Sequence, residues 1–91
     1  MAVEIYTTNF CGYCLLAKRI LKRKNISFVE INLDIEMEKR IEMNKRSQGR
    51  TTVPQIFFSD LHIGGHKELS VLEKTGGLDA ILAKKKFNIN V

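Results

Sequence analysis

Two cysteines with two residues between them, Cys11 and Cys14, constrain the fold of this chain more than any other feature. They lie where a short apolar run, Val3 to Tyr6, gives way to a pattern of helical period that begins at Gly12. A cysteine in the first turn of a helix faces unpaired backbone N–H groups and the positive end of the helix dipole. Both favour the thiolate, which is the nucleophilic form of the side chain. The pair therefore predicts a redox site at a strand-to-helix junction.

The size and cysteine content indicate a single domain that has no need of disulfide staples. The chain has 91 residues, of which 44% are apolar, and this is enough for one core. Two cysteines are too few for the disulfide framework of a small secreted protein. A bridge from Cys11 to Cys14 would close a very small loop and stabilise the fold little. We therefore expect one domain over residues 1–91 and a catalytic role for the cysteine pair.

The N-terminus and the charge pattern bear on location and partners. No basic segment followed by an apolar one precedes Val3, so the sequence predicts no signal peptide. No apolar run approaches the roughly 20 residues of a membrane span, and we expect a cytoplasmic protein with no membrane partner. The net charge is +5, but the Lys and Arg residues are scattered and lack an aromatic platform, which argues against a nucleic-acid partner. A basic surface near a thiolate instead favours anionic thiol substrates.

Periodicity and turn residues divide the chain into short strands and helices. The pattern predicts strands at Val3–Tyr6, Phe28–Asn32, Gln55–Phe58 and Leu61–Ile63, and helices at Gly12–Lys24, about Ile35–Arg46 and about Lys67–Lys74, with a last short helix around Leu78 and Leu82. Asn25 is expected to end the first helix in a left-handed conformation, and Asp34 to cap the second. The second helix carries a thin apolar stripe, Met37 with Ile41, and is expected at the surface. The tail from Phe87 has no clear assignment.

The order of these elements predicts the fold class. A strand–helix–strand unit favours a parallel pair of strands, and the two later strands, separated by Ser59 and Asp60, favour a hairpin. The expected fold is therefore α/β, with a four-stranded mixed sheet in the order β-α-β-α-β-β-α and helices on both faces.

Four features together resemble the glutaredoxin family, whose fold is thioredoxin-like. They are this element order, the Cys-Gly-Tyr-Cys motif, Thr52-Val53-Pro54 before the third strand, and Gly64-Gly65 after the fourth. The resemblance covers a core of about residues 1–84 and leaves a short C-terminal tail. Thioredoxins share the general fold but usually carry Trp before the motif and Gly-Pro inside it. This chain has Phe10 and Gly-Tyr there and contains no Trp.

The resemblance implies a glutathione-dependent thiol–disulfide oxidoreductase that reduces glutathione mixed disulfides and protein disulfides. Its partners are then glutathione and glutathionylated or disulfide-containing proteins, and it acts as a monomer. Cys11 is the implied nucleophile, Cys14 the resolving thiol, and Pro54 follows a cis peptide bond. The glutathione site that the resemblance implies consists of Tyr13, Thr52, Val53, Pro54, Gly65, His66, Lys67 and Glu68. Arg40 and Arg50 are candidates to replace a lysine that many relatives have at the position of Thr8.

This chain also departs from the family pattern, and the departures leave alternatives open. Gly12 stands where dithiol glutaredoxins usually have Pro, and His66-Lys67-Glu68 stands where they often have Cys-Asp-Asp. Family members with a small residue at position 12 sometimes bind a [2Fe-2S] cluster between two subunits, through the cysteine that corresponds to Cys11. A cluster-bridged dimer that carries iron–sulfur is therefore a second hypothesis. A thioredoxin-like protein driven by a reductase is a third.

The two histidines raise one further possibility. Cys11 and Cys14 together with His62 and His66 have the ligand types of a Cys₂His₂ zinc site. A zinc finger, however, has far fewer residues between its two pairs, and here the interval is long enough to hold several strands and helices. We therefore do not expect a structural zinc ion.

Overall fold

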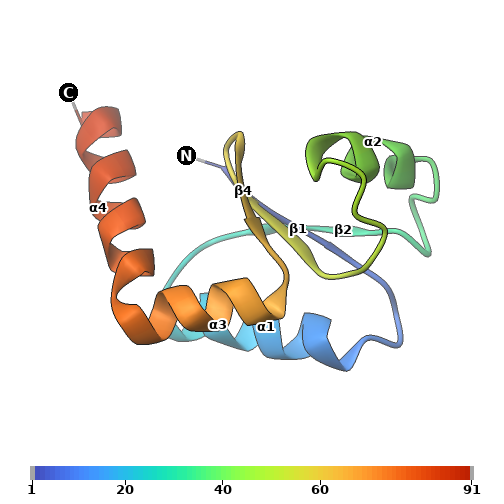
Figure 1. Ribbon diagram of the computed structural model, residues 1–91, viewed down its shortest axis with the longest axis horizontal. Helices are drawn as coiled ribbons and strands as arrows, with labels where there is room; N and C mark the ends of the chain where they lie inside the picture. Colours follow the sequence, from blue (N-terminus) through green and yellow to red (C-terminus); the bar gives the residue numbers. More distant parts are fainter. Residues whose placement is uncertain (1, 91) are drawn as a thin grey trace.

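The computed structural model describes the backbone of residues 2–90 and the side chains of residues 2–84, and it shows one sheet covered by helices (Figure 1). The strands are β1 (Val3–Thr7), β2 (Val29–Asn32), β3 (Gln55–Phe58) and β4 (Leu61–Gly64). The helices are α1 (Gly12–Arg23), α2 (Lys39–Arg46), α3 (His66–Thr75) and α4 (Gly77–Asn90). The sheet has the order β2-β1-β3-β4, with β1 parallel to β2 and antiparallel to β3, and β3 antiparallel to β4. The predicted four-stranded mixed sheet is confirmed.

Side chains that alternate along the strands divide the core between the two faces of the sheet. Val3 and Ile5 of β1 pack with Ile56 and Phe58 of β3 against α1, α3 and the start of α4. On the other face a smaller core, closed by α2, consists of Tyr6, Ile31, Leu33, Met43 and Phe57. The predicted arrangement, with helices on both faces, is therefore correct, and the loops after β1 and before β3 adjoin strands that contribute to both cores.

Helix α1 buries most of the face that its period predicts, which pairs Leu16 with Ile20 and Ala17 with Leu21, but Leu16 is 40% exposed. Ala17, Ile20 and Leu21 are buried in the larger core, and Cys14 lies one turn before them on the same helix. The helix ends as expected, because Asn25 has a positive φ of 57° and the N–H of Ile26 donates to the carbonyl of Leu21 at 2.9 Å.

Helix α2 differs from the prediction in its start and in its buried face. It begins at Lys39, and Asp34 does not cap it: the N–H of Asp34 instead donates to Oδ1 of Asn32 at 2.9 Å. The N–H groups of residues 35 and 36 also turn back to the carbonyl of Asn32, so the segment before Lys39 is a turn. The predicted stripe of Met37 and Ile41 is 72% and 65% exposed, and the residue that α2 buries is Met43.

The C-terminal helix is longer than the short helix expected from the sequence. Gly76 has a φ of 82° and ends α3, which allows α4 to begin at Gly77 in a new direction (Figure 1). Leu78 is buried against the larger core, and α4 continues to Asn90 through part of the tail left unassigned above. Val91 lies outside the described residues.

Arg46 of α2 connects this helix to the sheet through several polar contacts. The guanidinium of Arg46 donates to the hydroxyl of Tyr6 at 2.8 Å and to the carbonyl of Ser59 at 3.1 Å, and it pairs with Glu4 at 2.9 Å. It also lies 4.0 Å from the ring centroid of Phe57. The Tyr6 hydroxyl donates to Glu42, and burial, reinforced by this bond, raises the pKa of Tyr6 to about 12.

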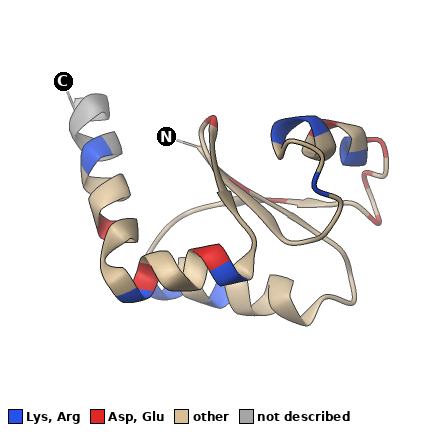
Figure 2. Cartoon of the chain, viewed as in Figure 1, with Lys and Arg blue, Asp and Glu red and all other residues tan. Residues whose placement is uncertain are grey.

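Charged residues of both signs are interspersed along α2 and α3 (Figure 2). No helix among the described residues has the length and apolarity needed to cross a membrane.

Candidate active site

The two cysteines form a disulfide at the start of α1. Cys11 is the N-cap residue of the helix and is half-buried, whereas Cys14 in the first turn is only 2% exposed. Cys11 is therefore the more exposed of the two cysteines, at the point where the chain enters the helix.

The start of the helix supports negative charge on Cys11. The backbone N–H of Cys14 donates to the Cys11 sulfur at 3.0 Å, which engages one of the free N–H groups of the first turn. No acidic residue lies in the first turn of α1 to oppose this effect. The thiolate at Cys11 stays a prediction for the reduced protein, in which this N–H is placed to stabilise it.

The cis-proline loop faces this sulfur. The Val53–Pro54 peptide bond is cis, as the family resemblance implies. The carbonyl oxygen of Val53 lies 3.9 Å from the Cys11 sulfur. Positions 11 and 53 meet because β1 and β3 are neighbours in the sheet, with Tyr6 paired to Gln55 close to both loops.

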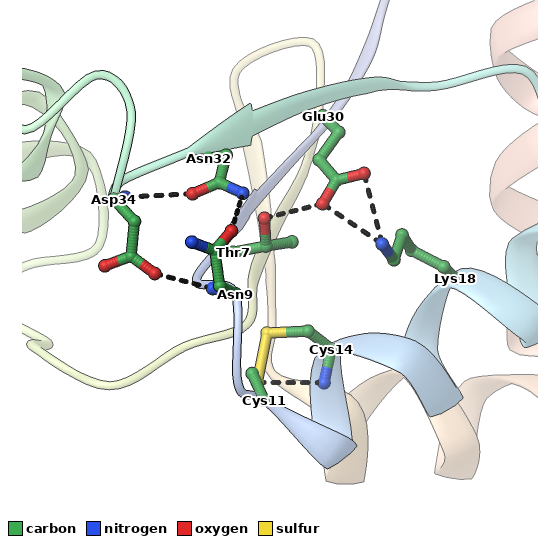
Figure 3. A network of polar contacts seen from close by, with 8 residues as sticks. All are labelled: Thr7, Asn9, Cys11, Cys14, Lys18, Glu30, Asn32 and Asp34. Atoms are coloured by element: carbon green, nitrogen blue, oxygen red, sulfur yellow. Dashed lines mark hydrogen bonds and ion pairs between the residues drawn. A yellow bond between two sulfur atoms is a disulfide. The ribbon is translucent and has the colours of Figure 1, made fainter.

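Polar contacts fix the segment that carries Cys11 (Figure 3). The backbone N–H of Asn9 donates to Oδ2 of Asp34 at 2.6 Å, and its side-chain oxygen accepts a bond from the amide of Asn32 at 2.8 Å. These bonds tie the loop after β1 to the end of β2. The carboxylate of Asp34 thus binds the loop before Cys11 and does not cap α2.

A second set of contacts joins β1, β2 and α1 beside the disulfide (Figure 3). The hydroxyl of the buried Thr7 donates to Glu30 at 2.7 Å, and Lys18, one turn beyond Cys14, pairs with the same carboxylate at 3.1 Å. Burial alone would raise the pKa of Glu30, but the bonds from Thr7 and Lys18 hold it below its ordinary value. The start of α1 is thereby held against the two parallel strands.

A groove of about 670 Å³ extends from the cis-proline loop along α3. Its lining includes all the residues predicted for a glutathione site except Arg40: Tyr13, Thr52, Val53, Pro54, Gly65, His66, Lys67 and Glu68. The guanidinium of Arg40 lies at the carbonyl of Thr51, at 3.4 Å, and is not part of the lining. Arg50, the other candidate arginine, does line the groove.

Five residues of the groove lining contact one another. The rings of Tyr13 on α1 and His66 on α3 are stacked, with centroids 5.4 Å apart and planes inclined at 29°. Glu68 reaches back over the helix start, where its Oε1 accepts bonds from the N–H of Gly65 at 2.6 Å and from Arg50 at 3.2 Å. The Gly65 N–H at the start of α3 is therefore bonded to a carboxylate of the protein itself, that of Glu68.

This placement predicts how acid affects the protein. The Gly65 N–H, helped by Arg50 against the effect of burial, holds the pKa of Glu68 below its ordinary value of 4.5. A carboxyl group with a lowered pKa in the folded state stabilises the fold fully above its unfolded pKa, and this contribution is lost as pH falls through the folded value. We expect Glu68→Gln to remove the corresponding part of the loss of stability below about pH 4.5, measured by urea unfolding from pH 6 to pH 3. An unchanged pH profile would contradict the assignment.

Three residues that line this groove, Ser70, Val71 and Lys74, were not predicted from the sequence. They follow Lys67 at helical spacings of three, four and seven, so the period of α3 carried the signal. It was overlooked because the family motif ends near Glu68.

The described part of a single chain does not bring together ligands for the zinc ion or the iron–sulfur cluster considered above. Among the side chains of residues 2–84, no group of three or more His, Cys, Asp or Glu residues is placed to hold a metal ion. His62 is hydrogen-bonded to Gln55, and His66 is stacked on Tyr13, so the zinc site is not assembled from these four residues.

A mixed four-stranded sheet with a Cys-x-x-Cys pair at the start of the first helix, opposite a cis-proline, defines a thiol–disulfide oxidoreductase of thioredoxin-like fold. The family model for glutaredoxin matches residues 3–63. Glutaredoxin 3 of Escherichia coli K12 is 54% identical over 80 residues, which span 88% of this chain and 95% of the relative. A glutaredoxin of Pseudomonas aeruginosa is 47% identical over 81 residues, 89% of this chain and 95% of that protein. The chain belongs to the glutaredoxin family, whose members are glutathione-dependent thiol–disulfide oxidoreductases.

Solved structures agree with this assignment. The solution structure of glutaredoxin from Brucella melitensis superimposes with a TM-score of 0.77 at 46% identity, over 90% of this chain and 88% of that one. A buckwheat glutaredoxin–glutathione complex superimposes with a TM-score of 0.80 at 25% identity, over 90% of this chain and 76% of that one.

Proposed function

We propose that this enzyme reduces mixed disulfides between glutathione and proteins at Cys11, with Cys14 as the resolving thiol for protein disulfides. The observation that carries the proposal is the asymmetry of the pair: the Cys11 sulfur is accessible at a helix start and faces the Val53 carbonyl of the groove, whereas Cys14 is buried.

The proposed reaction proceeds by two thiol–disulfide exchanges. The Cys11 thiolate attacks the glutathione sulfur of the mixed disulfide, a new sulfur–sulfur bond forms, and the protein thiolate leaves and takes up a proton. A second glutathione thiolate then attacks the glutathionyl sulfur, which releases glutathione disulfide and restores the Cys11 thiolate. For a protein disulfide, the Cys11 thiolate first attacks one sulfur of the disulfide and releases the other as a thiolate, which takes up a proton. The Cys14 thiolate then attacks the Cys11 sulfur, releases the second protein thiolate and closes the internal bridge. Two glutathione molecules later reduce this bridge to two thiols and leave as glutathione disulfide.

We assign the groove between α1, the cis-proline loop and α3 to the glutathione moiety. The Val53 backbone N–H and C=O pair with the cysteinyl residue as an added strand would. Tyr13 and His66 form one wall. Lys67 and the N–H groups of the first turn of α3, other than the Gly65 N–H that Glu68 binds, attract the γ-glutamyl carboxylate. Since both contacts of Glu68 fall on Oε1, we assign Oε2 to the substrate ammonium. Arg50 pairs with this same Glu68 carboxylate and therefore lies at the γ-glutamyl end, so Arg40, at the Thr51 carbonyl, is our candidate for the glycyl carboxylate.

A glutathione-coupled assay tests this function. One peptide is prepared as a mixed disulfide with glutathione and, separately, with cysteamine, which has the same sulfur chemistry but lacks the tripeptide. We expect the glutathionyl peptide to have a kcat/KM at least about tenfold higher, because binding of the tripeptide orients the reacting sulfurs. Equal values would show that the groove plays no part, and turnover with a thioredoxin reductase in place of glutathione would favour the thioredoxin-like alternative.

The role of Lys67 gives a prediction of its own. Lys67→Gln should raise the KM for the glutathionyl peptide by about three- to tenfold with little change in kcat, because one exposed charge-assisted contact is lost. The comparison variant is Lys22→Gln on the exposed side of α1, which lowers the net charge equally and lies outside the groove. If both variants raise KM alike, the effect is one of overall charge and the assignment of Lys67 fails.

We further propose that the working enzyme is a cytoplasmic monomer without a cluster. One chain offers a single accessible cysteine sulfur, so a [2Fe-2S] cluster would need the Cys11 thiolate of a second chain and glutathione as additional ligands. Anaerobic reconstitution with iron and sulfide, followed by sizing and absorption spectroscopy, separates the two hypotheses. A coloured dimer would establish the iron–sulfur carrier.

A further inference from the structure

Gln55 is a polar residue buried in the interior of the sheet. It has no exposed surface, directly follows Pro54, and its backbone pairs with Tyr6 of the neighbouring strand. Its side chain shares a face of β3 with Phe57, on the side covered by α2. An apolar residue would fill such a position without cost, whereas a buried amide destabilises the fold unless both of its ends are hydrogen-bonded.

Both ends of this amide are bonded, and the bonds connect two separate segments. Nε2 of Gln55 donates to the carbonyl of Thr52 at 3.1 Å and to its hydroxyl at 3.3 Å. Oε1 lies 2.7 Å from Nε2 of His62. Because the Thr52 carbonyl can only accept, the amide nitrogen must face Thr52 and the amide oxygen must face His62. His62 therefore carries a proton on Nε2 and donates it to Gln55.

His62 is itself held in place by β4. Its ring stacks on Phe57, with centroids 4.8 Å apart and planes at 25°. Burial, helped by the charges of Arg50 and Arg46 and opposed by Glu68, lowers the pKa of His62. The Nε2–H donor is present in this neutral form and in the cation alike, so the bond to Gln55 does not require a charged ring.

We propose that His62 and Gln55 are positioning residues for the reaction at Cys11. They hold Thr52 against β3 and so fix the loop whose Val53 backbone faces the Cys11 sulfur and lines the groove. Neither residue is part of the groove lining, so both act through Thr52 and Val53. The inference rests on the proposed function, in which this backbone binds the glutathione moiety.

The first test replaces the donor and keeps the stacked ring. His62→Phe should raise the KM for the glutathionyl peptide about five- to tenfold, which corresponds to the loss of about one hydrogen bond, with kcat changed by less than about twofold. His62→Gln, whose Nε2–H reaches a similar position, should restore most of the lost affinity. The alkylation rate of Cys11 by iodoacetamide in the reduced protein should not change, because the start of α1 is untouched.

A second variant keeps the inference testable if His62→Phe folds poorly. Gln55→Met retains the length of the side chain without its bonds and should produce the same rise in KM. The double variant should be no worse than either single variant, because both break one chain of contacts. Leu61→Ala, a half-exposed neighbour in β4, is the matched control and should leave KM unchanged.

The outcomes separate this inference from the proposed function. Unchanged KM in His62→Phe and Gln55→Met, additive effects in the double variant, or a slower alkylation of Cys11 would each overturn the positioning role. If the wild-type enzyme does not distinguish the glutathionyl from the cysteamine peptide, the proposed use of the groove fails first, and the inference fails with it. If the wild type distinguishes the glutathionyl from the cysteamine peptide, and both variants keep the wild-type KM, the inference alone is refuted and the proposed function stands.

Discussion

We expect that replacing Cys11 by serine will abolish reduction of both glutathione mixed disulfides and protein disulfides, with a loss of at least about a hundredfold in kcat/KM. The physical reason is that the hydroxyl of serine is not ionised at neutral pH, and the buried sulfur of Cys14 has no access to substrate. The measurement is the glutathione-coupled assay, with the glutathionyl peptide and a protein disulfide as separate substrates.

Cys14→Ser has a different effect on the two substrates. This variant should still reduce mixed disulfides with glutathione at roughly the wild-type rate, because a second glutathione, and not Cys14, releases the glutathionyl group from Cys11. Protein disulfides are not reduced through the internal bridge, which cannot form. The fold should be retained, because the bridge closes a loop of only a few residues and contributes little to stability.

The chain contains only these two cysteines, so each single variant reports on one sulfur alone. Mass spectrometry after exposure to glutathione disulfide should show one added glutathione on Cys14→Ser and none on Cys11→Ser. The opposite pattern would reverse the assignment of nucleophile and resolving thiol.

The largest expected effect on stability comes from Arg46. Arg46→Met keeps much of the aliphatic length but removes the contacts to Tyr6, Glu4 and the Ser59 carbonyl and the stacking on Phe57. We expect the free energy of unfolding to fall by about 2–3 kcal/mol, since a partly buried carboxylate and a buried hydroxyl each lose a charged partner. Urea unfolding, followed by circular dichroism, measures this change.

The matched control is Arg23→Met, which removes another arginine–glutamate pair. Arg23 contacts Glu73 at 2.8 Å, but it lies on the surface of α1 with most of its side chain in water. An exposed pair of this kind contributes little, so the denaturant midpoint should stay close to that of the wild type. An equal fall in the free energy of unfolding of both variants would show that the contacts of Arg46 stabilise the fold no more than an exposed ion pair does.

The fold was predictable where the hydrophobic period of the sequence is strong. It was less predictable where polar side-chain contacts determine where a helix begins. The strands and α1 follow from alternation and from the helical spacing of Ala17 with Leu21. The start of α2 was not predictable, because Asp34 is as suitable for capping a helix as for binding a loop. Only the folded chain brings Asn9 within 2.6 Å of its carboxylate.

The candidate site shows the same division. The Cys-x-x-Cys pair and the cis-proline followed from the motif and the family resemblance, and the groove contains nearly all of the residues expected there. The capture of Glu68 by Gly65 and Arg50 and the stack of Tyr13 on His66 depend on distances between separate elements. The role of Gln55 was hidden because its partners, Thr52 and His62, are joined only when β3 and β4 pair.

The burial of Cys14 has a consequence for the kinetics of the enzyme. Because only one sulfur of the pair reaches solvent, the electron donor and the electron acceptor must use the same entrance, one after the other. A ternary complex with both substrates cannot form at that entrance, so the first product departs before the second substrate arrives. We therefore expect turnover to be a double displacement, in which each substrate at high concentration competes with the other for the same form of the protein.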